Sequence, residues 1–145
     1  MSKTSRREKS NCPISYSLDL FGDKWTLLVL RDLLLWGRTR FADFQASDEK
    51  IASNILSDRL RRLEERGFIV TRKDPTDARQ KFYAATKKGE SLIPVLLEIA
   101  AWGASNDPQT GAPSGFAKDF YADREGYYSE HRHRIADLFE KQSDA

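Results

Sequence analysis

Residues 51–86 read IASNILSDRLRRLEERGFIVTRKDPTDARQKFYAAT, and this stretch carries the strongest indication of the fold. Apolar residues in its first half recur at the spacing of one helix face, which predicts a helix over residues 47–67 that ends at Gly67. The inward residues are Ile55, Leu56, Leu60 and Leu63. Beyond Gly67 the apolar period changes to two, so FIVTRK and KFYAAT predict two strands joined by a turn that Pro75 fixes.

The outward face of this helix carries only polar residues: Ser53, Asn54, Ser57, Asp58, Arg61 and Arg62. An asparagine amide can pair with an adenine edge, an arginine can bind guanine or phosphate, and small serines let the helix approach closely. Asp58 fits least well because a carboxylate repels phosphate, so we expect it to pair with Arg61 or Arg62, or to accept from cytosine. The alternative interpretation is that these are ordinary surface residues of a core helix.

Cations surround the predicted hairpin and a loop near residue 40. They are Arg72, Lys73, Arg79 and Lys81 in the hairpin, and Arg38 and Arg40 in the loop. Side chains of this kind neutralise phosphate when they lie on a hairpin wing. The basic hairpin therefore favours nucleic-acid binding over the ordinary surface interpretation of the neighbouring helix.

Helical patterns also precede the stretch. Pro13 suits the first turn of a helix that ends at Gly22, and Asp23 can cap the next helix, DKWTLLVLRDLLLWG. The apolar sector of that helix, from Trp25 to Trp36, is so wide that we expect it to be largely buried. A short helix, FADFQAS, follows the GRTR loop.

The chain after the hairpin predicts further helices. Thr86 can cap a helix that runs to Trp102, in which Pro94 either kinks the helix or lies in its first turn. NDPQTGAPSG is a linker by composition, and a last helical region follows it, interrupted at Gly126. That region holds more apolar surface than one isolated helix can hide, so we expect a dimer interface. The predicted interface residues are Trp102, Phe116, Phe120, Ile135 and Phe139.

The composition is that of one globular domain. With 145 residues, 39% hydrophobic and 32% charged, the chain can bury a core, and no apolar run approaches the ~20 residues of a membrane span. The start, MSKTSRREKS, lacks the apolar core of a signal peptide, and one cysteine permits no internal disulfide. We therefore expect a soluble, cytoplasmic protein.

Charge is segregated along the chain. Residues 38–88 carry a net charge of +5 and residues 89–145 a net charge of −5, whereas residues 1–10 carry +3 and residues 11–37 carry −1. A basic middle joined to an acidic end is typical of a nucleic-acid binder. Solvated helix faces of unequal charge are the alternative explanation.

The order of predicted elements is two helices, a short helix, a longer helix, a basic hairpin and further helices, which is the winged helix-turn-helix arrangement. The predicted fold is mainly α with a small β-hairpin wing and terminal dimerisation helices. We divide the chain into a basic flexible tail over residues 1–11, a winged helix-turn-helix DNA-binding domain over 12–104, and a linker with a dimerising C-terminal helical region over 105–145.

Several segments together resemble one family. CPISYSLDLFGDKWTLLVLRDLL, RTRFADFQAS, IASNILSDRLRRLEERGFI and DPTDARQKFYAATKKGESLIPVLLEIAAWG are similar to the HxlR-type winged-helix transcriptional regulators of bacteria, relatives of the MarR-type regulators. The resemblance covers residues 12–103 and implies a homodimer that binds a pseudo-palindromic operator in double-stranded DNA. One departure is Ala52, where many members carry serine, so we expect a cap or phosphate contact to be missing there.

The leading hypothesis is a homodimeric, sequence-specific DNA-binding repressor of transcription. The alternative is a winged-helix protein–protein interaction module whose basic surface docks an acidic protein. No enzyme, metal site or cofactor is predicted, because the only histidines, His131 and His133, are two apart and have no cysteine nearby. A glycine-rich phosphate loop and a nucleophile elbow are also missing from the sequence.

Cys12 has a regulatory interpretation. The resembling family includes members that sense electrophiles or oxidants through the matching cysteine, which implies that oxidation or alkylation of Cys12 alters DNA affinity. A helix N-terminus and a basic tail would favour its thiolate, whereas the alternative is a small packed residue with an inert thiol. A small-molecule effector bound between the DNA-binding body and the dimer helices is a further hypothesis, and no residue identifies that ligand.

Overall fold

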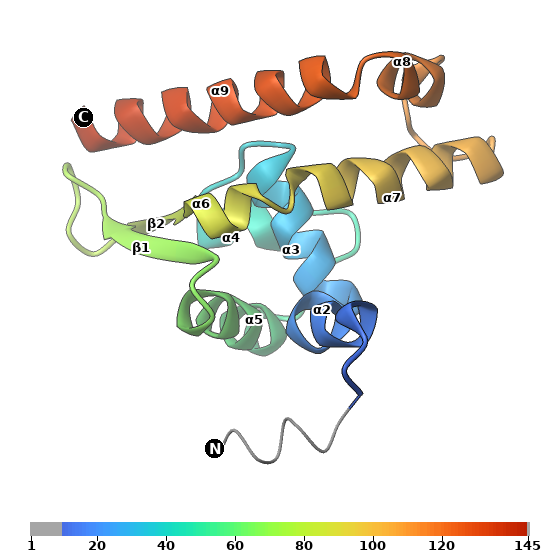
Figure 1. Ribbon diagram of the computed structural model, residues 1–145. Coiled ribbons are helices and arrows are strands. Elements are labelled where there is room, and N and C mark those ends of the chain that lie inside the picture. Colours follow the sequence, from blue (N-terminus) through green and yellow to red (C-terminus); the bar gives the residue numbers. More distant parts are fainter. Residues whose placement is uncertain (1–9, 145) are drawn as a thin grey trace.

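The computed structural model describes residues 10–144, in which a two-stranded antiparallel hairpin extends from one side of a helical body (Figure 1). In chain order the elements are α2 (Pro13–Phe21), α3 (Lys24–Leu34), α4 (Phe41–Gln45), α5 (Ser53–Glu65), β1 (Ile69–Lys73), β2 (Lys81–Ala85), α6 (Lys87–Glu90), α7 (Ile93–Asn106), α8 (Phe116–Ala122) and α9 (Arg124–Asp144). This mainly helical order with one hairpin confirms the predicted fold class. The predicted basic tail lies, up to residue 9, outside the described residues.

The core is built around α3, which contacts α5, β2 and α7. Its fully or nearly fully buried apolar residues are Val29, Leu30, Leu33 and Leu34. The helix begins as predicted, because the Asp23 carboxylate accepts a hydrogen bond from the Thr26 N–H at 3.1 Å. The predicted burial of Trp36 is wrong: the helix ends at Leu34, and Trp36 is 53% exposed with the Arg31 guanidinium 4.0 Å from its ring centroid.

The longer helix, α5, begins at Ser53, later than the sequence pattern predicted, because turns and a bend occupy residues 46–49. Ala52 precedes it without a side-chain cap, as expected. At its end the Phe68 N–H donates to the Leu63 carbonyl at 2.9 Å while Gly67 adopts φ +82°, the left-handed conformation that favours glycine. This turn directs the chain from the helix into the hairpin.

The hairpin has a fixed register, from Ile69 opposite Ala85 to Lys73 opposite Lys81. Its turn is held by Asp74, whose carboxylate accepts from the Thr76 N–H at 2.8 Å and forms a 2.7 Å ion pair with Arg40. Hydrogen bonds from Thr76, with the Arg40 charge, lower the pKa of Asp74 to about 2. The turn is therefore held by an ionised carboxylate throughout the neutral range.

The predicted helix from Thr86 to Trp102 is divided in two. Thr86 caps the short helix α6 by accepting from the Gly89 N–H at 3.1 Å, and Pro94 lies in the first turn of α7. The proline therefore starts a helix and does not kink one. Gly126 was expected to interrupt the last helical region, but the break lies at Asp123, between α8 and α9.

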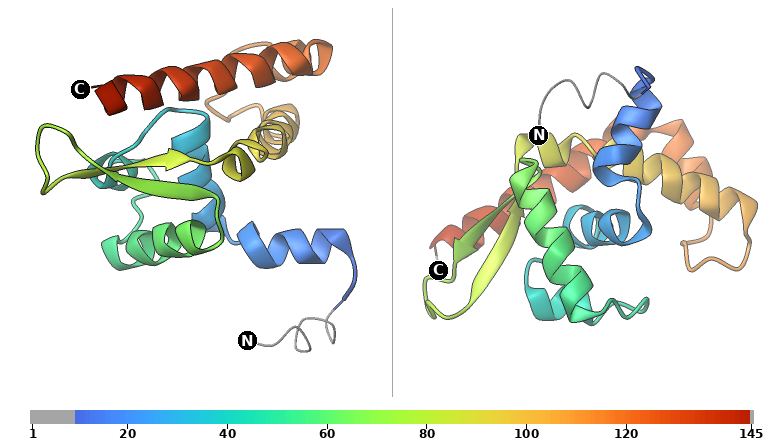
Figure 2. Two further views of the ribbon diagram at one scale, coloured as in Figure 1. Left: turned by 60° about the vertical axis from the view of Figure 1, so that its left-hand side comes forward. Right: turned by 90° about the horizontal axis from the view of Figure 1, so that it is seen from below.

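The C-terminal helix α9 folds back across the hairpin on the side opposite α5 (Figures 1 and 2). Arg134 Nη2 donates to the Leu35 carbonyl at 3.0 Å, and the Arg72 guanidinium lies 4.6 Å from the ring centroid of Phe139. Phe120, in α8, is fully buried. The C-terminal region thus packs onto its own domain. Within residues 10–144, no helix combines the length and apolar character needed to cross a membrane.

Candidate nucleic-acid interface

The outward face of α5 is polar and accessible. Ser53, Asn54 and Ser57 are exposed, and the side chains of Arg61 and Arg62 are 59% and 45% exposed. The opposite face of the helix is anchored by three buried leucines, which are Leu56, Leu60 and Leu63. Five of the six predicted recognition residues are therefore presented on one side of a helix whose other side is fixed in the core.

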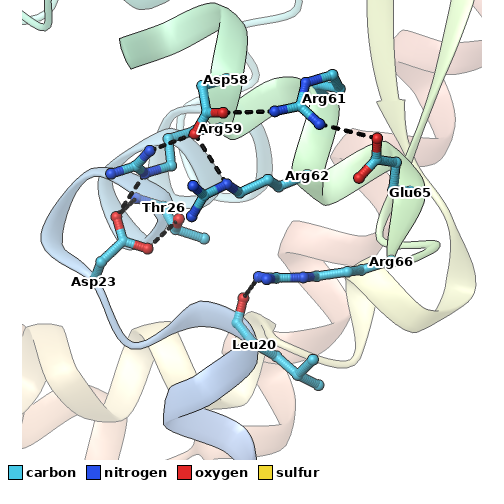
Figure 3. Close-up of polar contacts among 9 residues, drawn as sticks. All are labelled: Leu20, Asp23, Thr26, Asp58, Arg59, Arg61, Arg62, Glu65 and Arg66. Carbon is cyan, nitrogen blue, oxygen red and sulfur yellow. Dashed lines mark hydrogen bonds and ion pairs between the residues drawn. The ribbon is translucent and has the colours of Figure 1, made fainter. Parts of the chain in front are cut away.

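Asp58, the sixth of these residues, is the centre of an arginine cluster (Figure 3). Its carboxylate accepts from Arg59 Nη1 at 2.6 Å and Arg61 Nη2 at 2.7 Å, and lies 2.9 Å from Arg62 Nε. Desolvation alone would raise the pKa of Asp58, but these arginines hold it below its ordinary value. The predicted pairing with Arg61 or Arg62 is confirmed, and Arg59 is a further partner that the sequence pattern did not indicate.

Two arginines, Arg59 in α5 and Arg66 at its C-cap, connect this helix to the corner between α2 and α3. Arg59 Nε donates to the Asp23 carboxylate at 2.8 Å, and Arg66 Nη1 donates to the Leu20 carbonyl (Figure 3). Burial would raise the pKa of Asp23, but hydrogen bonds from Thr26 and Arg59 lower it. Asp23 therefore caps α3 and also holds α5 at a set position. Sequence reasoning missed both arginine contacts, because no local pattern pairs residues so far apart in the chain.

The wing presents cations at its tip, beside the turn that joins β1 to β2. Arg79 is 91% exposed and 3.2 Å from Asp77, and Lys73 lies directly opposite Lys81 across the antiparallel pair, with both residues exposed. Like charges directly opposite each other in a sheet are destabilising. An anion bound at this end would be attracted by both lysines.

Three further cations of the predicted wing and flank are also engaged within the chain. Arg72 lies over Phe139, and Arg40 is paired with Asp74. Arg38 turns inward, where its Nη1 donates to the Ser47 hydroxyl at 2.5 Å and lies 3.7 Å from Asp32. The guanidinium of Arg38 therefore interacts with the buried Asp32 and Ser47 pair, and we no longer expect it to contact phosphate.

The sequence matches a family model described as HxlR-like helix-turn-helix over residues 20–110. The chain belongs to this HxlR-like family. It is 33% identical over 98 residues to the HTH-type transcriptional regulator YybR of Bacillus subtilis (strain 168), a match that covers 68% of this chain and 78% of YybR. The family and its relatives are DNA-binding transcriptional regulators and not enzymes.

Two solved structures place the HxlR-like fold among winged-helix regulators. PA1607, described as a candidate transcription factor, is 37% identical with a TM-score of 0.62, and the match covers 75% of this chain and 72% of PA1607. The redox regulator HypR in its oxidised form is 29% identical with a TM-score of 0.60, over 66% of this chain and 98% of HypR. The resemblance to HxlR-type regulators predicted from the sequence is confirmed.

The predicted dimer residues of this HxlR-like chain divide into two groups. Trp102, on α7, is 67% exposed. Phe116 and Ile135 pack partly buried against the core, and Phe139 lies under Arg72. The prediction that Phe120 lies in the dimer interface is wrong. Its ring is fully buried among aromatic residues of its own chain, so it cannot contact a partner.

Cys12 and the histidines belong to elements other than α5, namely α2 and α9. Cys12 is exposed at the N-cap of α2, and the basic residues expected beside it lie outside the described part of the chain. His131 is half-buried next to Arg134, and burial lowers its pKa. In the described residues, 10–144, no group of three His, Cys, Asp or Glu side chains is arranged to hold a metal ion.

One ion pair joins α3 to the segment that precedes α5, and it gives a pH prediction. Arg31 binds both oxygens of Glu49, at 2.8 and 2.9 Å, which lowers the pKa of Glu49 from 4.5 to about 2. Because the folded-state pKa is the lower one, this stabilisation is complete above pH 4.5 and is lost as the pH falls toward 2. We expect Glu49→Gln to lower the free energy of unfolding by about 0.5–1 kcal/mol at neutral pH.

Urea unfolding of the Glu49→Gln variant and the unsubstituted chain should be compared at pH 7 and pH 3. We expect the difference between the two chains to shrink at the lower pH, where the pair is being lost. A difference of the same size at both values would contradict the assignment of the pKa shift to this ion pair.

Proposed function

We propose that this chain is a homodimeric, sequence-specific DNA-binding regulator of transcription that represses from a pseudo-palindromic operator. Its family and its relative YybR support the regulatory role. In this proposal α5 enters the major groove, where Asn54, Ser57 and Arg62 meet base edges, and the wing contacts phosphates. A chain of this kind represses by occupying promoter DNA.

The observation that carries the proposal is that Lys73 lies opposite Lys81 at the tip of the wing. The two lysines are exposed, directly opposite and of like charge, beside a helix whose outward face is wholly polar. Two exposed cations on neighbouring strands attract a polyanion, whose phosphates they would neutralise. Among polyanions, duplex DNA has the groove that accepts an exposed helix such as α5.

The proposed dimer surface consists of two apolar stripes that the chain leaves uncovered. α2 has no buried residue, and its Ile14 and Leu18, one turn apart, are 69% and 56% exposed. On α7 the stripe contains Val95, Ile99 and Trp102, all exposed. Exposed apolar side chains that line up on one helix face are typical of protein interfaces. Two-fold symmetry would then place the two α5 helices on half-sites about one helical turn apart.

The proposal predicts how wing substitutions change the salt dependence of binding. Replacing Lys73 and Lys81 with alanine is expected to reduce the slope of log affinity against log salt by about 0.9 for each phosphate that the wing no longer neutralises. The fall in affinity should be similar for specific and random duplexes, because phosphate contacts carry no sequence information. Fluorescence anisotropy over a salt series measures it.

Lys118→Ala with Arg132→Ala is the matched control, since it removes two exposed cations from α8 and α9. An unchanged slope in the wing variant would contradict a phosphate contact at this end. If the slope of log affinity against log salt falls equally in the control, the loss reflects the lower net charge of the protein and not a phosphate contact at the wing. Binding of an acidic protein with no preference for any duplex would favour the interaction-module alternative.

We also propose that Cys12 makes DNA binding sensitive to oxidants or electrophiles. Its thiol is exposed, and α2 joins the corner that Arg59 and Arg66 hold against α5. The redox regulator HypR, solved in oxidised and reduced forms, supports this proposal. We expect diamide to change operator affinity of the unsubstituted chain and to leave Cys12→Ser unaffected. The same diamide response in both proteins would refute it.

A further inference from the structure

The Asp58 carboxylate contacts three arginine side chains of α5. Its Oδ1 accepts from Arg61 Nη2, and its Oδ2 lies within 2.9 Å of both Arg59 Nη1 and Arg62 Nε (Figure 3). Arg61 is also paired with Glu65 at 3.0 Å. The arginines on the polar face of α5 are thus already paired with carboxylates of their own chain.

These ion pairs reduce the affinity that α5 contributes to the binding of DNA of arbitrary sequence. A phosphate that binds Arg61 must take the place of Asp58 or lie beside it, so part of the new attraction only replaces an existing ion pair. The repulsion between the phosphate and the Asp58 carboxylate opposes binding further. Contacts that depend on phosphate charge alone are therefore weakened.

A base edge does not meet the same obstacle. Arg62 contacts Asp58 through Nε, which leaves both of its Nη groups to donate to the neutral acceptors of guanine. The carboxylate then holds the guanidinium in place while it binds the base. Arg62 can therefore bind a guanine and keep its contact with Asp58, whereas a phosphate competes with Asp58 for the same guanidinium.

We infer that Asp58 is a specificity-determining residue, which holds Arg61 and Arg62 away from arbitrary phosphates and positions Arg62 for a purine edge. This inference rests on the proposed DNA-binding function and deepens it. Asp58 acts through the arginines and is a positioning residue. The same carboxylate would lower the affinity for random DNA more than the affinity for the operator.

The test compares the unsubstituted chain with Asp58→Asn on two duplexes of about 30 bp, which is long enough for two half-sites one helical turn apart. One is the sequence that the unsubstituted chain enriches from a random library, and the other is its scrambled form. We expect Asp58→Asn to bind the scrambled duplex roughly tenfold tighter, with a salt slope steeper by about 1, and to bind the selected duplex no tighter. The specificity ratio therefore falls roughly tenfold.

Two variants keep the result interpretable. Asp58→Glu retains the carboxylate and should recover most of the ratio, whereas Asp137→Asn makes the same charge change at an exposed position of α9 and should leave the ratio unchanged. Equal changes on both duplexes, or the same result from Asp137→Asn, would overturn the inference and leave the proposed function intact. A lack of preference in the unsubstituted chain itself would overturn both.

Discussion

Replacing Leu18 and Trp102 with glutamate is expected to convert the proposed dimer into a monomer and to lower operator affinity at least about 100-fold. The reason is that a dimer binds its second half-site in an intramolecular step, which raises affinity by about 10²–10⁴ over one half-site. Both side chains are exposed in the protomer, so the charges should not disturb its core. Sedimentation velocity measures the mass, and anisotropy measures the affinity for the selected duplex.

Glutamate at Ser129 and Ala136 is the control for the dimer prediction. These positions are exposed on α9, so the same two negative charges are added away from the proposed interface. We expect the control to remain dimeric and to bind as the unsubstituted chain does. A Leu18 and Trp102 variant that stays dimeric at micromolar concentration would show that the interface lies elsewhere.

Gly89→Ala is expected to lower the free energy of unfolding by about 1–3 kcal/mol, the usual cost of overpacking. A Cβ at Gly89 would collide with the Phe68 carbonyl oxygen, which is backbone and cannot turn away as a side chain would. The same carbonyl accepts from the Thr86 N–H at 3.0 Å, so the collision falls where α5, the wing and α6 meet. Guanidinium unfolding followed by circular dichroism measures the loss of stability.

Gly111→Ala is the comparison for Gly89→Ala. Gly111 lies in the loop between α7 and α8, and nothing approaches within 4 Å of an added Cβ. We expect its stability to change by no more than about 0.5 kcal/mol. Equal stability of the two variants would mean that the junction around Phe68 adjusts without cost, contrary to the close packing of its carbonyl against Gly89.

Features that depend on neighbouring residues could be predicted from the sequence. The caps at Asp23 and Thr86, and the pairing of Asp58 with arginines one turn away, follow from local hydrogen-bonding rules. The change of apolar period after Gly67 likewise predicted the switch from helix to hairpin. These patterns also carry the family resemblance, because the same segments build the DNA-binding fold.

Features that depend on distant packing could not be predicted. Arg38 and Arg79 are both arginines in basic loops, but only the first has the buried Asp32 and Ser47 beside it. The aromatic residues of the C-terminal region indicated a missing partner, and for Phe120 that partner is the rest of its own chain. Apolar content predicts that a surface is covered, but it does not identify what covers it.

A competition experiment shows whether a dimer of this chain recognises a particular duplex sequence, on which the proposed function depends. The unsubstituted chain is titrated onto its labelled selected duplex at about 0.15 M salt and then challenged with scrambled or unlabelled selected DNA. We expect two protomers per duplex and a preference for the selected sequence of at least about 10³-fold. Equal displacement by both competitors would contradict sequence-specific recognition.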